Sequence, residues 1–182
     1  MRPVQDWGLR SLMKSSEPSD FAPCEQKRLI MRFQGKLYKD GKFWLAEVPI
    51  FAALTQGRTR KEAVAMIADW FVTLINRPGF SVTVYEGKKG VFEISASDTK
   101  AMVCLLLQRQ RQLNGLSLAA AAERLGAKSR NAYARYEQGR SVPTVEKLDK
   151  LLQAVSGGRD FVLLPSPFIP SRKATKEYLG GR

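Results

Sequence analysis

Strand signals in the pattern of apolar and polar residues fill the first half of the chain and vanish after Asp98, where helical periods replace them. Residues 29–38 are apolar and β-favouring, and the next four residues supply turn chemistry before residues 43–48 resume the strand pattern. Two such runs around a short turn predict a β-hairpin. Residues 53–57 predict a third short strand that ends at a glycine turn.

A helix is predicted to follow this third strand. Thr59 and Glu62 form a capping box, in which a hydroxyl and a carboxylate accept hydrogen bonds from free amides at the helix start. One apolar stripe with helical spacing comes next and must cover a sheet: Ala63, Ile67, Trp70, Phe71 and Leu74. Residues 81–85 and 91–95 predict a second hairpin. The order β-β-β-α-β-β predicts a small α+β domain over residues 27–97.

Four helices are predicted in the next part of the chain. The first covers about residues 100–113, and the second starts with Ser117 as its N-cap. The third spans residues 129–138, and the fourth is capped by Thr144. Three side chains of the first helix are predicted to face inward: Met102, Leu106 and Leu113. Residues 100–156 are therefore expected to form an all-α domain, so the fold class is α+β followed by a helical domain.

Both ends of the chain are predicted as tails. Residues 1–26 contain three prolines and a serine-rich centre, so no packed structure is expected there. Residues 157–182 are predicted as a C-terminal strand and a flexible tail. The strand candidate is the apolar run of residues 161–164, and the tail begins at Pro165.

The charge of the chain favours nucleic acid as a partner. Its 30 lysine and arginine residues outnumber 17 aspartate and glutamate residues, which gives a net charge of +13 at pH 7. The surplus is concentrated in residues 101–182, which hold 14 basic and 6 acidic side chains. A surplus of this kind attracts polyanions before any specific contact forms.

The residue types exclude much enzyme chemistry. Histidine is absent, which removes imidazole bases, Ser-His-Asp systems and zinc sites that need histidine. Cys24 and Cys104 lack the spacing of a metal site or of a disulfide scaffold. No stretch has the length of a signal-peptide core or a membrane span. We expect a soluble cytoplasmic protein that is not an enzyme and holds no metal and no cofactor.

The second and third helices of the helical part, joined by residues 126–128, predict a helix-turn-helix whose third helix enters a DNA major groove. That helix opens with Ser129, Arg130 and Asn131, where free amides favour phosphate. Arginine prefers guanine and asparagine prefers adenine, so Arg130 and Asn131 are the candidates for reading bases. Three more residues border this surface and are candidates for phosphate contacts: Lys128, Arg135 and Arg140.

Two stretches resemble known families. RQRQLNGLSLAAAAERLGAKSRNAYARYEQGRSVPTVEKLDKLLQAV, within residues 102–155, resembles the Cro and phage-repressor type of helix-turn-helix, the Xre family. LYKDGKFWLAEVPIFAALTQGRTRKEAVAMIADWFVTLI resembles the core of the HicB antitoxins. Together they look like the HicB subclass with a C-terminal DNA-binding domain. The resemblance implies a partial ribonuclease-H-like fold that blocks a small ribonuclease toxin of the HicA family, and a dimeric domain that binds operator DNA and represses the shared operon.

The resemblance also assigns roles to single residues. Arg111 and Glu137 correspond to positions that pair between helices in the repressor family. The Ser-Gln that usually opens the second helix is Ser-Leu here, so Ser117 or a backbone amide is expected to make the phosphate contact. Tyr133 and Tyr136 have the spacing of the buried face of the third helix, so we expect them in the core.

Four residues near the first hairpin are candidates for the toxin-binding surface: Tyr38, Phe43, Trp44 and Glu47. Aromatic residues anchor interfaces, and a carboxylate can meet a basic partner. Because Phe43 and Trp44 alternate, one of them faces away from the core. A homodimer or tetramer is expected, because two-fold proteins read inverted repeats, and residues 161–164 are the candidate dimer strand.

Two other functions remain open. The chain could be a stand-alone helix-turn-helix regulator whose first domain senses a ligand or oligomerises. It could also be a nuclease targeted by its helix-turn-helix, but such chemistry needs clustered carboxylates that hold two metal ions, and the pattern does not supply them. A neighbouring gene for a small basic protein would favour the antitoxin over the regulator.

Overall fold

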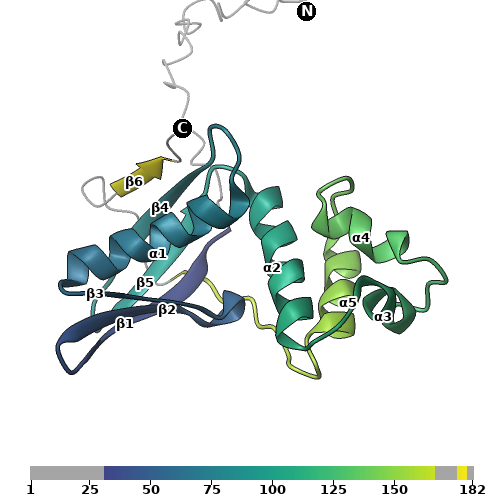
Figure 1. Ribbon diagram of the computed structural model, residues 1–182, viewed down its shortest axis with the longest axis horizontal. Helices are drawn as coiled ribbons and strands as arrows, with labels where there is room; N and C mark the ends of the chain where they lie inside the picture. Colours follow the sequence, from purple (N-terminus) through teal and green to yellow (C-terminus); the bar gives the residue numbers. More distant parts are fainter. Residues whose placement is uncertain (1–30, 167–175, 180–182) are drawn as a thin grey trace, which may run out of the picture.

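The computed structural model describes residues 31–166 and 176–179, so the predicted N-terminal tail lies outside the described residues. An antiparallel sheet and one helix form the first part, and four helices form the second (Figure 1). The predicted α+β class is confirmed.

In the described residues, six strands form a single antiparallel sheet in the order β3-β2-β1-β5-β4-β6. The bounds are β1 Phe33–Asp40, β2 Phe43–Val48, β3 Ala53–Gly57, β4 Ser81–Glu86, β5 Val91–Ala96 and β6 Lys176–Leu179. A short 3-10 helix, η1 (Pro49–Phe51), connects β2 to β3. The predicted first three strands and second hairpin are therefore present, and β6 is an addition that the sequence did not predict.

Helix α1 (Arg60–Ile75) covers one face of this sheet. The hydroxyl of Thr59 accepts a hydrogen bond from the amide of Glu62 at 3.1 Å, as the capping box predicts. The carboxylate of Glu62 accepts from the amide of Arg58, one residue before the expected position. A Cβ at Gly57 would collide with the backbone of Ala63, so this glycine lets the helix start directly on the end of β3.

The second part consists of α2 (Thr99–Leu113), α3 (Leu118–Arg124), α4 (Asn131–Glu137) and α5 (Val145–Val155). Three of these helices begin at a side-chain cap, supplied by Asp98, Ser117 and Thr144. The predicted inward position of Leu113 is wrong, since 44% of this residue is exposed at the end of its helix. No helix in the described ranges is long and apolar enough to cross a membrane.

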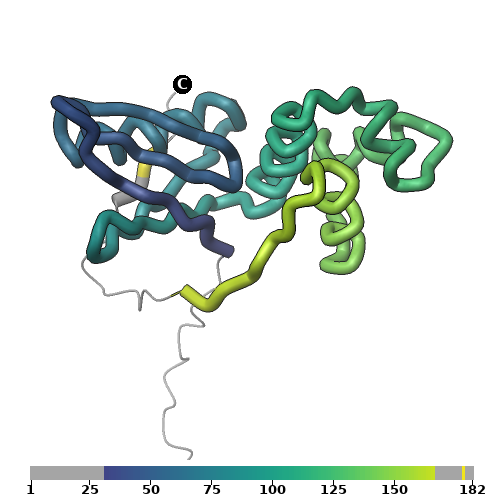
Figure 2. The backbone as a smooth tube through the Cα atoms, turned by 90° about the horizontal axis from the view of Figure 1, so that it is seen from below, coloured from purple at the N-terminus to yellow at the C-terminus, as the bar shows by residue number. Residues whose placement is uncertain are grey.

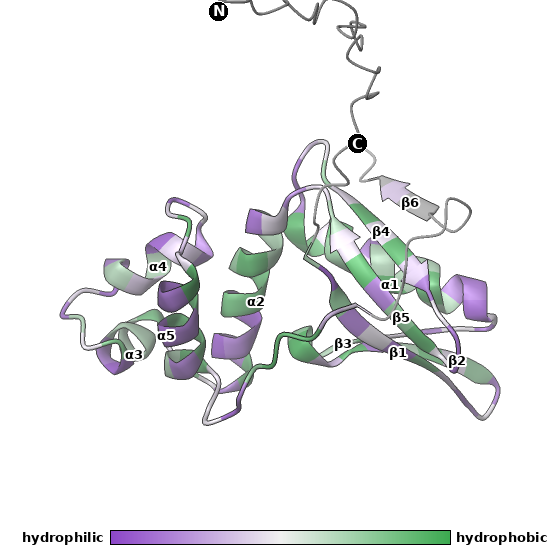
Figure 3. Cartoon of the chain, turned by 180° about the vertical axis from the view of Figure 1, so that it is seen from behind, coloured by the Kyte–Doolittle hydropathy of each residue, from purple (hydrophilic) through white to green (hydrophobic). Residues whose placement is uncertain are grey.

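Helix α2 belongs to both parts of the molecule. It packs against α1 and η1 on one side and against α4 and α5 on the other, and Figure 3 shows hydrophobic turns in its first half and hydrophilic ones toward its end. Gln110 donates a 2.6 Å hydrogen bond to the carbonyl of Ile50, and Arg109 donates to the carbonyl of Phe51. The buried residues accordingly form one continuous core that spans the sheet layer and the helices.

The predicted strand at residues 161–164 is wrong. These residues are extended but have no strand neighbour among residues 31–166 and 176–179, because they run from α5 back beneath the sheet and not along its edge (Figure 2). The hydroxyl of Ser166 donates to the carboxylate of Glu93 at 2.7 Å, which fastens the segment to the sheet. The strand of this region is β6, which pairs with β4 within the range predicted as a flexible tail.

Candidate nucleic-acid interface

Two tyrosines anchor α4 from within. Tyr133 is fully buried and donates a hydrogen bond from its hydroxyl to the carbonyl of Leu107 in α2, at 3.1 Å. Burial raises the pKa of Tyr133, so the hydroxyl keeps its proton. Tyr136 is also buried. The prediction that both tyrosines belong to the core is confirmed, and the opposite face of α4 is left for solvent or a ligand.

An ion pair fixes α4 to α2. Arg111 Nε lies 2.7 Å from Glu137 Oε1, and Arg111 Nη2 lies 3.1 Å from Oε2, so the guanidinium and the carboxylate pair through two bonds. Arg111 also donates to the carbonyl of Leu116, in the turn before α3. The bond to Glu137 raises the pKa of Arg111. The predicted pairing is confirmed. Through Arg111, helix α2 is bonded both to α4 and to the turn before α3.

All seven predicted DNA-binding residues are exposed: Ser117, Lys128, Ser129, Arg130, Asn131, Arg135 and Arg140. The start of α4 differs from the prediction by two residues, because Ser129 and Arg130 form a turn and the helix begins at Asn131. The hydroxyl of Ser129 accepts from the amide of Asn131 at 3.3 Å, which favours that turn.

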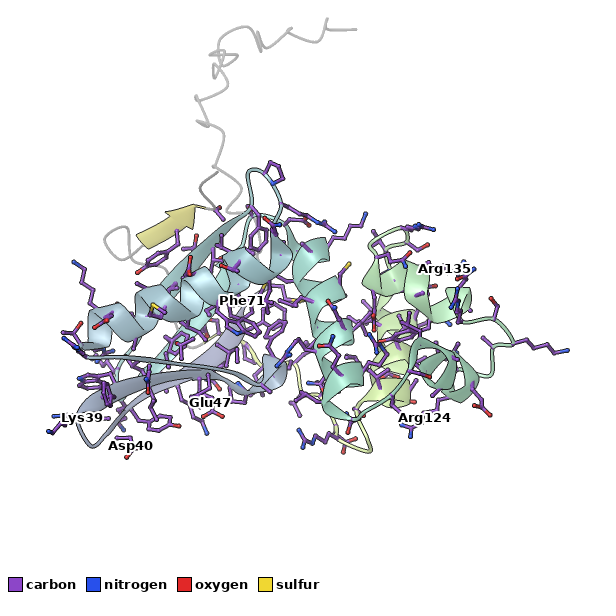
Figure 4. The ribbon with its side chains drawn as sticks, viewed as in Figure 1. Lys39, Asp40, Glu47, Phe71, Arg124 and Arg135 are labelled. Carbon is purple, nitrogen blue, oxygen red and sulfur yellow. The ribbon has the colours of Figure 1, made fainter. Side chains whose placement is uncertain are left out.

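Some of these seven side chains form hydrogen bonds within the protein, and others carry a charge that no ion pair among the described residues neutralises. Ser117 is occupied as the cap of α3, where its hydroxyl accepts from Ala120. Arg135 lies over the ring of Tyr136 and donates to the tyrosine hydroxyl, and Figure 4 shows it on the outer side of α4. In the part of the chain that the structure describes, Arg130 and Arg140 form no ion pair, so their charge can meet a phosphate.

The candidate toxin-binding residues divide between the two faces of the sheet. Phe43, Tyr38 and Glu47 lie on the face away from α1, whereas Trp44 lies on the α1 side and packs against the core. Figure 4 shows Phe71 between α1 and the sheet and Glu47 on the opposite side. Phe43 is therefore the aromatic residue that faces away from the core.

The sequence did not single out Leu54, which extends this outer face. Leu54 is 56% exposed and lies beside Glu47 in the register of β2 and β3. The alternation of β3 could have identified it, since Ala53 and Gly57 are buried while the residues at 54 and 56 are exposed. We call Tyr38, Phe43, Glu47 and Leu54 the outer patch.

Four carboxylates of the first part each have a different partner. The carboxylate of Glu62 accepts from the amide of Arg58 at the start of α1, Glu86 pairs with Arg60, Glu93 pairs with Arg32, and Asp98 caps α2. Across residues 31–166 and 176–179, no group of three or more potential metal ligands lies close together.

Residues 107–155 match a sequence family described as helix-turn-helix. The match runs from within α2 to the last residue of α5, so it contains the anchored α4 and its exposed basic surface. Comparison with curated proteins gave no match. The fold and the match define a DNA-binding transcription regulator with an N-terminal antiparallel sheet. The helix-turn-helix half of the predicted resemblance is thereby confirmed.

Proposed function

We propose that the protein is the antitoxin of a HicA/HicB type II toxin-antitoxin system and the repressor of its own operon. The observation that carries this proposal is the combination of a DNA-binding domain with a sheet that α1 covers on one face only. The other face bears the outer patch, whose aromatic and aliphatic side chains are available to a protein partner. Residues 37–75 resemble the HicB core, which supports the same function.

The proposed mechanism is steric and needs no catalysis by this chain. A HicA-like ribonuclease would bind the outer patch, where Phe43 and Leu54 supply apolar contact and Glu47 supplies a carboxylate for a basic partner. Glu47 lies opposite Lys36 in the register of β1 and β2, so the face that bears the patch carries both signs of charge despite the net positive chain. Glu86 and Glu93, two carboxylates of the sheet, pair with different arginines, which supports a protein without nuclease activity.

The outer patch is tested in the full chain with Phe43→Glu and Leu54→Glu. We expect the double variant to lose protection of cells that co-express the neighbouring small basic gene product, because two charges would be buried at the interface. The matched control is Met66→Glu, since Met66 is exposed to 45% on α1, away from the patch. Full protection by the double variant would remove the patch from the toxin-binding surface.

The DNA interface is tested with Arg130→Ala and Asn131→Ala. Each change is expected to weaken binding to the upstream region of its own gene by about 1–3 kcal/mol and to relax the preference at single base pairs. Lys88→Ala removes the same charge as Arg130→Ala, but from an exposed turn between β4 and β5, and serves as the control. Footprinting would contradict the assignment if both variants kept the wild-type affinity and sequence preference.

A stand-alone regulator is the second candidate, because the helix-turn-helix match supports regulation without naming a toxin. Co-purification separates the two candidates. An antitoxin retains the neighbouring small protein through purification, whereas a regulator that senses a ligand or oligomerises does not.

A further inference from the structure

A cluster of basic side chains joins the two parts of the molecule beside α4. Gly139 follows the C-cap of α4 and has a φ of +68°, and a methyl group placed on it would lie 3.4 Å from Arg77 Nη2 and 3.4 Å from Lys100 Cε. Arg140 follows directly in the chain. Figure 1 shows the turn after α4 coming back toward the start of α2. We call Arg77, Lys100 and Arg140 the bridging cluster.

The fold builds this cluster from separate segments. Arg77 lies in the turn after α1, and its guanidinium contacts the carboxylate of Asp98 at 3.4 Å. Asp98 caps α2 by accepting from the amide of Ala101, so the turn is tied to the helix that begins there. Lys100 is the second residue of that helix. The sheet-bearing part thus brings Arg77 next to the DNA-binding domain.

The positive charge of the cluster is only partly neutralised. Arg77, Lys100 and Arg140 are all exposed, and Asp98 is the acidic partner of Arg77. Glu137 lines the same shallow hollow as Arg77, but its carboxylate is taken by Arg111. Burial raises the pKa of Cys104, so the thiol beneath the cluster stays protonated and adds no negative charge. Lys100 and Arg140 form no ion pair within the described ranges.

We propose that Arg77 and Lys100 bind the phosphate backbone of DNA, beside the phosphates that Arg140 meets, and so extend the DNA-binding surface onto the sheet-bearing part. The proposal rests on DNA binding through α4. Phosphates follow one another about every 3.4 Å along the axis of a DNA strand, so cations gathered around one glycine can meet neighbouring phosphates. Such contacts raise affinity for any sequence and do not read bases.

The test compares two double variants of the full chain. Arg77→Gln with Lys100→Gln removes the proposed contacts. Arg60→Gln with Lys61→Gln is the matched control at the far end of α1, where Arg60 forms an equally exposed ion pair with Glu86. Both variants lose the same charge. The probe is a fluorescein-labelled duplex of about 30 base pairs, roughly three helical turns, without an inverted repeat.

Binding is measured by anisotropy over a series of salt concentrations. For Arg77→Gln with Lys100→Gln we expect a several-fold weaker affinity and a slope of log affinity against log salt that is shallower by about two units. The control variant should keep the wild-type slope. Competition with DNA from upstream of the gene should show an unchanged sequence preference in both variants.

Two results would overturn the proposal while wild-type protein still binds the duplex. One is an unchanged slope in the Arg77 and Lys100 variant with an unaltered circular dichroism spectrum. The other is an equal change of slope in both double variants, which would mean that the slope depends on the net charge of the protein and not on a local contact. Absence of wild-type binding would instead refute the DNA-binding function on which the proposal depends.

Discussion

Arg111→Ala is expected to lower the free energy of unfolding by about 3–5 kcal/mol, the range for removing one partner of a buried ion pair. The guanidinium and carboxylate side chains of Arg111 and Glu137 are only 15% and 9% exposed. The substitution would leave the carboxylate of Glu137 without its partner and the carbonyl of Leu116 without its donor. Since small domains are stable by about 5–15 kcal/mol, a large share of the variant is expected to unfold at mild urea concentrations.

Urea unfolding followed by circular dichroism measures this loss. Arg60→Ala is the matched control, because its ion pair with Glu86 is 40% exposed on each side and should contribute at most about 1 kcal/mol. Replacing Arg111 and Glu137 together with leucine should recover much of the loss, since no unpaired charge remains. A small effect of Arg111→Ala, similar to that of the control, would mean that water reaches Glu137 and that the pair does not fix α4.

Local sequence signals predicted the individual elements well. Strands β2 and β3 show alternating apolar and polar residues, and this pattern is visible in the sequence. The helix caps at Thr59, Ser117 and Thr144 are hydrogen bonds between residues close in the chain, so the sequence predicts them too. The start of α4 was misplaced because a hydroxyl at Ser129 fits two roles. It can cap a helix or stabilise a turn, and here it accepts from Asn131 within a turn.

Long-range contacts were not predictable in the same way. Nothing in the neighbourhood of Gln110 shows that its amide reaches the carbonyl of Ile50, 60 residues earlier, so the sharing of α2 by both parts was missed. Strand β6 was missed because its four residues include a lysine and a glutamate, and its pairing with β4 spans the whole helical part. Arg77, which we propose as a phosphate contact, could not be a candidate from the sequence for the same reason, since only the fold brings it beside Gly139.

For the outer patch, the alternation of residues along a strand predicts only part of the arrangement. Period two separates Phe43 from Trp44 but does not say which of them faces the core. That choice depends on α1, which covers the face where Trp44 lies. Once the covered face is known, the register of β2 and β3 places Leu54 beside Glu47 and completes the patch.

For the homodimer that the sequence predicts, Leu163→Pro is expected to give monomers and to weaken operator binding by about 100-fold or more, because two linked half-sites gain at least that factor from their effective concentration. Val162, Leu163 and Leu164 are 73%, 86% and 76% exposed, and the segment is extended. Its backbone has no strand neighbour in the described ranges, so it can pair with the same segment of a second copy. Proline removes one backbone donor and prevents such pairing.

Leu163→Val is the matched control, since valine keeps an apolar, strand-forming residue at that position. Light scattering after gel filtration measures the oligomeric state, and anisotropy on upstream DNA measures affinity. Point substitutions are preferable to removing the C-terminal residues, because truncation would also strip β6 from β4 and Ser166 from Glu93. A dimer of undiminished affinity in Leu163→Pro would refute the segment as the dimer contact. Val145, exposed to 78% at the start of α5, would then be the next position to change.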